Sequence, residues 1–491
     1  MVGPDRPAPG NAAALVRLRL RMYRVGFGDC FLLSFEYDDE LDDGRRARHV
    51  LIDFGSTSLP AGRNVLENVG SLIRSHSAGQ LDAVVATHRH ADHLSAFGKA
   101  DLADQLVVEG FPRLVVRSWT EDPDAARDAQ SAFDPAGARA AFGDRSAAFV
   151  ASLGAAEDLA RALQDKLAGA GSQSLAGQLN QLVEEQLSNA KAVARLAAWA
   201  GDERGEYLHY GMPTRLQSLI PGLTVHVLGP PTVDQHPAVA RQSSRDPSEF
   251  WMIYRRQVVE RLRASDLLEA GASSEEASSH EVRGDVSPGL GPDPAQDEAP
   301  MPRRPRGDPG PVRWLTDRMR RQQLNSLLHI VRTLDSALNN TSVILLFDVQ
   351  TAAGPLRLLF GGDAQIENWE YALKAAPDAQ ANCDLLRTVD LYKVGHHGSR
   401  NATPRTLFNL WTEPGTEARP MTALMSTKGN VHGKTVATAV PRKTLVAALD
   451  TRMEGRFYST QSLRAPNPFF ELEADLTAGK EFRLISPPLA P

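Results

Sequence analysis

The stretch ATHRHADHLSAFG, residues 86–98, decides the fold. It follows an apolar, β-branched run, which predicts a buried strand. His88 and His90 stand two positions apart where the strand ends, so both side chains point to the same side and can bind one metal ion. Asp92 and His93 follow in the turn to the next helix and are placed for a second ion. These four side chains predict a metal site, whereas the alternative is a polar turn of hydrogen-bonded histidines.

Four residues on one loop leave two metal ions without enough ligands, and later strands end in further candidates. Asp363 follows LLFGG, and its carboxylate could bridge two ions or simply cap a turn. His396 and His397 lie in YKVGHHGS; because neighbours in a strand point opposite ways, both can face the site only if the backbone turns there. His432, in STKGNVHGK, is a further ligand candidate or a surface turn residue. Imidazole and carboxylate ligands favour two divalent ions, zinc first, with manganese also compatible.

Strand-like and helix-like segments alternate along the chain, which predicts the α/β class in layers. We expect one domain over residues 1–491, with an N-terminal half at 16–119 and a C-terminal half at 213–250 plus 322–485. Alanine-, leucine- and glutamine-rich sequence predicts a helical cap inserted at 120–212. A proline-, glycine- and serine-rich tract predicts a flexible low-complexity loop at 264–312.

Two arginine-rich stretches allow more than one interpretation. VRLRLRMYRV, residues 16–25, alternates apolar and basic residues and predicts an edge or half-exposed strand. Residues 303–321 hold seven arginines against two aspartates, which fits a solvated helix start or, alternatively, a strip that contacts phosphate groups.

Composition excludes several classes of protein. The net charge of −6 gives the whole molecule no attraction for nucleic acid or anionic lipid, so a polyanionic substrate needs a local field. Only Cys30 and Cys383 are present, too few for a disulfide framework or a cysteine-rich zinc site. Without a signal-peptide core or an apolar run of membrane-spanning length, we expect a cytoplasmic protein with no membrane segment.

THRHADH resembles the HxHxDH signature of the metallo-β-lactamase superfamily, and Asp53 in LIDFG resembles that family's first motif. The order VGFGDC, LIDFG, THRHADH, LLFGGDA and KVGHHGS is similar to the metallo-β-lactamase-like domain of ComEC-type DNA-uptake proteins, the branch marked by HHGS. It is also similar to bacterial phosphorylcholine esterases of that branch. The resemblance covers residues 16–119, 220–232 and 336–450. It implies an αββα sandwich.

The resemblance also implies roles for individual residues. His88 and His90 would bind one metal ion, Asp92 and His93 the other, with Asp363 between the two. A histidine of HHGS, assigned as His397, and His432 would complete the ligand sets, leaving His396 to donate to a phosphoryl oxygen. Asp53 would orient a ligand without binding metal. The family's middle ligand histidine has no clear counterpart, because His226 stands mid-strand and fits a core or supporting role better.

The reaction these residues predict is hydrolysis by a metal-activated water, with Asp92 positioning the nucleophile. We expect a phosphodiesterase, most plausibly a nuclease acting on DNA or RNA, with bacterial conflict or defence as a hypothesis about its setting. One alternative is a small-ester hydrolase acting on a β-lactam, thioester or phosphorylcholine-type diester. A second is a non-catalytic component with structural metal ions that binds a protein partner through the cap.

Overall fold

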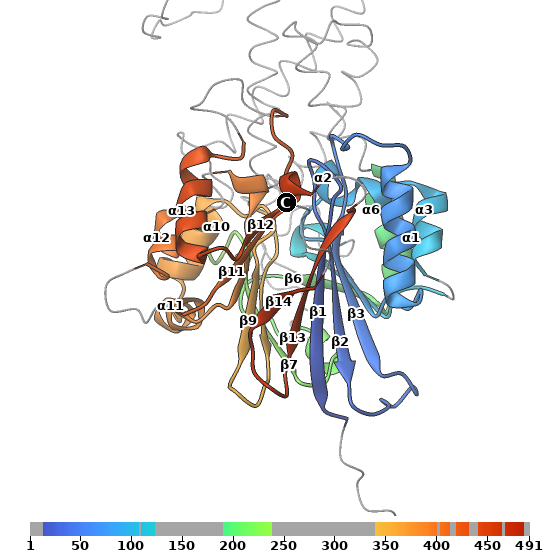
Figure 1. Cartoon of the computed structure of the whole chain (residues 1–491), viewed down its shortest axis with the longest axis horizontal. Helices are drawn as coiled ribbons and strands as arrows, with labels where there is room; N and C mark the ends of the chain where they lie inside the picture. The colour runs from blue at the N-terminus through green and yellow to red at the C-terminus, as the bar shows by residue number, and fades with distance from the viewer. Residues whose placement is uncertain are drawn as a thin grey trace, which may run out of the picture.

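The computed structural model describes residues 13–107, 110–122, 190–237, 339–399, 403–412, 419–431, 440–463 and 467–485. Within these ranges, two mixed β-sheets stack face to face and helices cover their outer faces (Figure 1). The predicted α/β class is therefore confirmed. The expected low-complexity loop and most of the expected cap lie outside the described residues.

The first sheet has eight strands in the order β14-β13-β1-β2-β3-β4-β5-β6 among the described residues. Its pairs from β14 to β3 are antiparallel, and those from β3 to β6 are parallel. The strands are β1 (Leu15–Tyr23), β2 (Cys30–Tyr37), β3 (Ala47–Phe54), β4 (Ala83–Val85), β5 (Leu114–Ser118), β6 (Gly205–Leu208), β13 (Phe469–Asp475) and β14 (Phe482–Leu484).

The second sheet has six strands in the order β12-β11-β10-β9-β8-β7 within the described ranges. Strands β9 to β12 run parallel, while β7 and β8 are antiparallel additions. The strands are β7 (Leu223–Gly229), β8 (Ile344–Val349), β9 (Leu356–Phe360), β10 (Leu391–Lys393), β11 (Thr422–Met425) and β12 (Phe457–Ser459).

Most of the helices bury an apolar stripe against the outer face of a sheet. Leu66 and Ile73 of α1 and Trp199 of α6 join the buried cluster on the first sheet. Trp369 and Leu449 belong to the cluster on the second. The helices are α1 (Val65–Ser77), α2 (Ala91–Leu94), α3 (Ala100–Leu106), α6 (Ala190–Ala200), α7 (Leu216–Leu219), α10 (Ile366–Glu370), α11 (Ala379–Arg387), α12 (Arg405–Asn409) and α13 (Lys443–Met453).

The core between the sheets draws on both ends of the chain. Leu18 and Leu20 of β1 belong to the same buried cluster as Leu345 and Phe347 of β8. Burying a side chain of this size contributes roughly 1.5–3 kcal/mol. Strands β13 and β14, near the C-terminal end of the sequence, cross over to pair beside β1 in the first sheet. The first sheet therefore combines strands from the N-terminal and C-terminal parts of the sequence, whereas the strands of the second sheet lie within residues 223–459.

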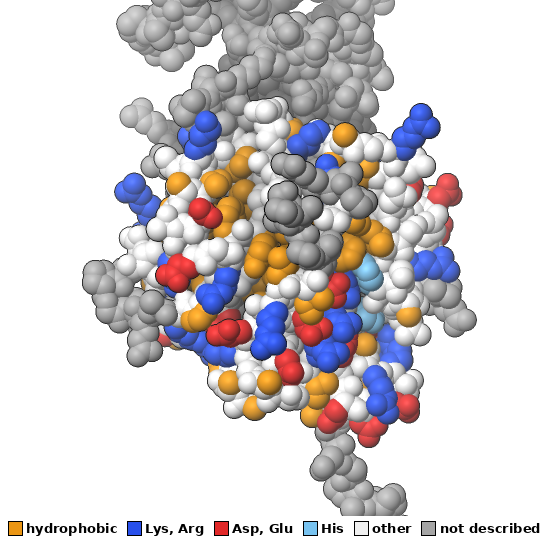
Figure 2. Space-filling view, in the orientation of Figure 1, with side chains coloured by type: hydrophobic (Ala, Val, Ile, Leu, Met, Phe, Trp, Pro, Cys, Tyr) orange, Lys and Arg blue, Asp and Glu red, His pale blue; other side chains and the backbone are white. Residues whose placement is uncertain are grey.

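The arginine-rich strand β1 lies inside the first sheet, so the edge alternative for residues 16–25 is wrong. Arg17 and Arg19 are partly exposed, whereas Arg21 is buried. Leu18 and Leu20 face the core. On the opposite face Arg19 contacts Glu36 at 3.0 Å and Glu473 at 2.8 Å, across the two neighbouring strands. Figure 2 shows basic and acidic side chains lying side by side on the face of the molecule that it displays. Cross-strand pairing of opposite charges lets the strand occupy an interior position.

The expected boundary of the cap at residue 212 is also wrong. Helix α6 packs into the buried cluster of the first sheet, and β6 extends that sheet beside β5. Both elements lie within residues 120–212 yet belong to the layered core. The alanine-rich composition of α6 suits any helix, so composition alone could not separate a core helix from an inserted one.

In the part of the chain that the structure describes, no helix combines the length and the apolarity required to cross a membrane.

Candidate metal centre

The loops that carry the expected ligands meet at one edge of the two sheets. Asp53 lies near the end of β3, and the segment 87–93 follows β4. Asp363 follows β9, and the 3-10 turn η6 (His396–Gly398) follows β10. Because β3 is parallel to β4 and β9 to β10, each pair of strands delivers its terminal residues to the same edge.

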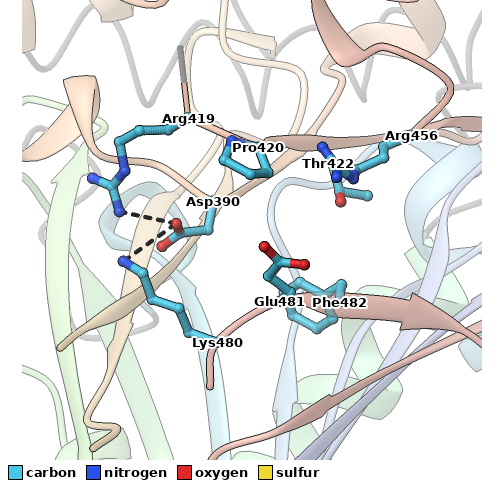
Figure 3. A pocket seen from close by; sticks show the side chains of 8 residues that line it. All are labelled: Asp390, Arg419, Pro420, Thr422, Arg456, Lys480, Glu481 and Phe482. Atoms are coloured by element: carbon cyan, nitrogen blue, oxygen red, sulfur yellow. Dashed lines mark hydrogen bonds and ion pairs between the residues drawn. The ribbon is translucent and has the colours of Figure 1, made fainter. Parts of the chain in front are cut away.

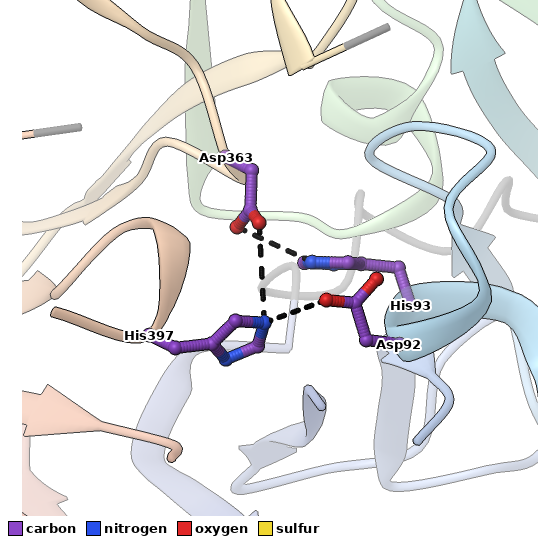
Figure 4. Close-up of side chains that lie close together, drawn as sticks. All are labelled: Asp92, His93, Asp363 and His397. Atoms are coloured by element: carbon purple, nitrogen blue, oxygen red, sulfur yellow. Dashed lines mark hydrogen bonds and ion pairs between the residues drawn. The ribbon is translucent and has the colours of Figure 1, made fainter. Parts of the chain in front are cut away.

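Four side chains form the centre of the site: Asp92, His93, Asp363 and His397 (Figure 4). Each offers one ligand atom, and all four atoms lie within 4.8 Å of one another. Asp363 faces both imidazoles, with Oδ1 3.2 Å from Nε2 of His93 and Oδ2 3.9 Å from Nε2 of His397. Residues from both sheets thus converge on one carboxylate.

The ring of His397 is held with its ligand nitrogen toward the carboxylates. Its Nδ1–H donates to the backbone oxygen of Ser426 at 2.9 Å, so Nε2 carries the lone pair of the neutral ring. That Nε2 lies 2.9 Å from Oδ2 of Asp92. A lone pair opposite a carboxylate oxygen is repulsive unless a proton or a metal ion lies between them. A proton on Nε2 or a metal ion at this position would each satisfy the contact.

His93 is oriented in the same way by Asp53. Oδ2 of Asp53 lies 2.7 Å from Nδ1 of His93, which leaves Nε2 directed at Asp363. Asp53 is itself fixed, because the backbone N–H of Thr87 donates to its Oδ1 and the Thr87 hydroxyl donates to its Oδ2. Asp53 therefore stands behind the ligand histidine, the geometry expected for a residue that orients a metal ligand.

His88 and His90 lie directly beside this cluster and are buried. Nε2 of His88 is 3.0 Å from Nδ1 of His90, and the rings of His88 and His93 have centroids 4.2 Å apart. Two nitrogen ligands of one tetrahedral zinc ion stand roughly 3.3 Å apart, given bonds of about 2.0–2.1 Å. The pair is therefore close to the spacing that a shared ion requires.

The two histidines of the HHGS motif are separated by a turn of the backbone. His396 has φ of 42° and His397 of 52°, both in the left-handed region that non-glycine residues rarely occupy. The turn buries His397 in the cluster and leaves the side chain of His396 28% exposed, with Nε2 4.0 Å from Oδ2 of Asp363. His397 thus belongs to the four-residue cluster, and His396 lies at its rim.

The electrostatics of the cluster favour positive charge between its carboxylates. Burial opposes protonation of His93, but Asp363, Asp53 and Asp92 outweigh it and raise its pKa well above the usual range. Burial likewise opposes protonation of His397, and its hydrogen bond to Asp92 and the charge of Asp363 raise its pKa. His88 behaves oppositely, because burial and its histidine neighbours lower its pKa well below the usual range.

The carboxylates respond to the same charges. Burial disfavours ionisation of Asp363, yet the charges of His93 and His396 hold its pKa well below the usual range. The pKa of Asp92 is lowered as well, against burial, by His93 and by the hydrogen bond to His397. Buried, ionised carboxylates facing imidazole nitrogens are the donor set of a divalent metal site.

One atom of the cluster lacks the partner that a metal ion could supply. Oδ2 of Asp363 is buried and has no hydrogen-bond partner among the described residues. A buried polar atom without a partner costs about 1–3 kcal/mol, and a charged oxygen costs more. A cation lying between Asp363 and the two imidazoles would satisfy this oxygen.

Two further sequence candidates remain. His432 lies outside the described residues, so the structure does not test it. His226 lies in the middle of β7, opposite Leu346 of β8, and belongs to no metal-ligand group among the described residues. His226 therefore does not serve as the middle histidine ligand found in the metallo-β-lactamase superfamily, which the sequence resembles.

Sequence reasoning missed two charged residues of the site, Asp29 and Lys393. Both are buried, and they form an ion pair directly behind the ligands. Asp29 belongs to the GFGD turn and Lys393 to YKVGHHGS, so both stood within motifs already noted. Their positions next to the ends of predicted strands were the one sequence feature that pointed to the site. The sequence does not show that two residues so far apart form an ion pair.

No protein-family model matches this chain, and no curated protein matches it.

Proposed function

We propose that this chain is a metal-dependent hydrolase of the metallo-β-lactamase fold that cleaves phosphodiester bonds in DNA or RNA. The observation that carries the proposal is Asp363 lying between Nε2 of His93 and Nε2 of His397. The order of the motifs supports the fold, as do the helix, sheet, sheet and helix layers.

In this proposal the described residues hold two divalent ions. His88 and His90 would bind one ion and Asp92 and His93 the other, with Asp363 between the two and His397 completing the ligand sets. His432, outside the described residues, is the further ligand that the resemblance implies. We infer zinc as the first choice, with manganese also compatible. When bound, such ions supply an activated water and positive charge for the oxyanion that develops in hydrolysis.

The protein's own groups then have separate tasks. Because its pKa is lowered, Asp92 is a weak base, so it orients the attacking water by accepting a hydrogen bond. His396, at the rim, donates to a phosphoryl oxygen of the substrate. Asp53 keeps Nε2 of His93 directed inward through the contact at Nδ1.

Phosphodiesters are favoured over other substrates for two reasons. The motif order, ending in KVGHHGS, resembles a branch whose members process DNA. A site with two divalent ions also suits the in-line displacement at phosphorus. Since the chain carries a net charge of −6, attraction of a polyanion must come from the centre itself.

A substrate panel tests the proposal. The full chain, loaded with zinc or manganese, is incubated with single- and double-stranded DNA, RNA and bis-p-nitrophenyl phosphate. We expect cleavage of the phosphodiester probe and of at least one nucleic acid, abolished by His90→Ala. Turnover of nitrocefin, a thioester or p-nitrophenyl phosphorylcholine alone would replace the nuclease proposal by small-ester hydrolysis. With two ions bound and no substrate turned over, the catalytic proposal is wrong.

A further inference from the structure

Directly behind the ligand loops, a buried ion pair joins the two sheets. Asp29 precedes β2 of the first sheet, and Lys393 is the last residue of β10 in the second. Oδ2 of Asp29 contacts Nζ of Lys393, and both residues are at most 2% exposed. Because each charge loses its hydration here, neither would be stable without the other.

Lys393 also contacts the turn that carries the central carboxylate. Its ammonium donates to the backbone oxygen of Gly362 at 3.2 Å and lies 3.7 Å from Oδ1 of Asp363. The lysine therefore holds the turn after β9 against the end of β10, the two segments that supply Asp363 and His397.

Asp29 makes the matching contacts on the other side. Its backbone N–H donates to the backbone oxygen of Asp92 at 2.9 Å. Its carboxylate lies 3.7 Å from Nδ1 of His93 and 3.8 Å from Nδ1 of His397. The charged groups of the pair thus lie near His93, Asp363 and His397, and the backbone of Asp29 holds that of Asp92.

Asp29, Asp53 and His93 also form a group whose spacing could hold a metal ion. The ammonium of Lys393 already lies against Asp29. At this second group the ammonium of Lys393 therefore provides the positive charge that a metal ion would otherwise provide.

We propose that the Asp29–Lys393 pair positions the metal ligands and thereby sets the affinity of the centre for divalent ions. Both are positioning residues, because they act through Asp363, Asp92 and the two histidines. The inference rests on the proposed metal centre, but it is independent of the proposed substrate.

The test removes both charges together, so that the net charge around the centre stays the same. In Asp29→Asn/Lys393→Met the ammonium no longer holds Gly362 and Asp363. We expect the affinity for zinc, measured by titration against a competing chelator, to fall roughly 10- to 100-fold, the usual loss for a residue supporting a metal ligand. We also expect the visible spectrum of the cobalt-loaded protein to change, because the ligand geometry alters.

The opposite end of β10 offers a matched control. Asp390 precedes this strand and contacts Nζ of Lys480 at 3.5 Å and Nη2 of Arg419 at 3.2 Å, beside a small surface cavity (Figure 3). Asp390→Asn/Lys480→Met likewise removes one negative and one positive charge, beside the opposite end of β10 and away from the ligands. We expect zinc affinity and the cobalt spectrum to stay unchanged.

Folding of each variant is checked by circular dichroism and thermal unfolding without metal. If the methionine variant does not fold, Asp29→Asn/Lys393→Gln keeps a polar pair and is measured in the same way. Unchanged affinity and spectrum in a folded variant would overturn the proposal. So would failure of both variants to fold beside a folded control, because the pair would then serve the fold alone. Because these measurements use no substrate, they test the positioning role even if the protein proves not to be a hydrolase.

Discussion

Nδ1 of His93 lies 2.7 Å from Oδ2 of Asp53, and this contact decides which ring nitrogen of His93 faces Asp363. With Nδ1 donating to the carboxylate, Nε2 keeps its lone pair for a metal ion. Asp53 can accept this bond because Thr87 fixes both of its oxygens.

Replacing Asp53 by asparagine should therefore weaken metal binding without moving the backbone. The Thr87 N–H needs an oxygen at the Oδ1 position, so the amide nitrogen takes the place of Oδ2 and faces His93. His93 must then accept at Nδ1 and carry its proton on Nε2. We expect zinc affinity, measured by chelator competition, to fall roughly 10- to 100-fold in Asp53→Asn.

Asp82→Asn is the control. Asp82 stands just before β4 and is as buried as Asp53, and its carboxylate accepts a hydrogen bond from the backbone N–H of His49 at 2.8 Å, away from the metal ligands. It should lower stability yet keep the zinc affinity of the parent. Equal zinc affinities in Asp53→Asn and Asp82→Asn would show that Asp53 does not orient the ligand.

The two histidines of η6 should separate metal binding from turnover. His397→Ala removes a buried ligand, so we expect loss of bound metal, measured by elemental analysis after dialysis. His396→Ala removes a rim donor, so metal content should stay at the parent's level. The kcat for bis-p-nitrophenyl phosphate should fall roughly 10²- to 10⁴-fold, as for loss of a proton-donating group. The reverse pattern would exchange the two assignments.

Gly28 is required by close packing under the ligand loop. A Cβ at this position would meet the backbone oxygen of Gly55 at 2.2 Å and that of Asp92 at 2.6 Å. Because neither neighbour is a flexible side chain, Gly28→Ala must shift the loop. We expect it to lower the free energy of unfolding by about 1–3 kcal/mol in urea titrations without metal, and to weaken metal binding.

Gly44→Ala provides the comparison, because Gly44 also has positive φ but no atom lies within 4 Å of an added Cβ. It should cost only the backbone preference, about 1 kcal/mol, and leave metal affinity intact. If the two alanine variants bind metal equally well, Gly28 does not support the ligand loop.

We expect the free energy of unfolding to fall at low pH because the buried His49 is neutral in the folded protein. Burial, together with the charges of Arg21, Arg45 and Arg48, lowers its pKa from 6.5 to about 4. Because the folded state takes up the proton more weakly than the unfolded state, the stability from neutral His49 is complete above about pH 6.5. It is lost as the pH falls toward 4, by at most about 3 kcal/mol.

Urea unfolding of the chelator-treated protein at pH 7.5 and pH 5 measures this effect. His49→Gln lacks the titrating ring, so it should lose less stability over this interval than the parent, by about 2 kcal/mol at most. Identical losses in the two proteins would show that His49 titrates normally in the fold.

The sequence was sufficient to predict features that depend on local periodicity. The strand before His88 and the polar residues at the strand ends both follow from the spacing of apolar residues. The sequence did not decide which of His396 and His397 faces the cluster. That choice depends on the positive φ of both residues, which the sequence pattern does not predict.

What could not be predicted depends on which segments meet. The place of β1 between β2 and β13 requires a strand from the other end of the sequence. The ion pair of Asp29 and Lys393 likewise joins the N-terminal part of one sheet to the other. Such contacts are set by tertiary packing, which a single sequence does not reveal.

The most direct test of the account is a metal titration of the chelator-stripped full chain beside Asp363→Asn. We predict that the parent binds two zinc ions, measured by calorimetry and elemental analysis, and that Asp363→Asn folds but binds them far more weakly. Failure of the folded parent to bind divalent ions, or equal binding by Asp363→Asn, would contradict a metal centre built around Asp363.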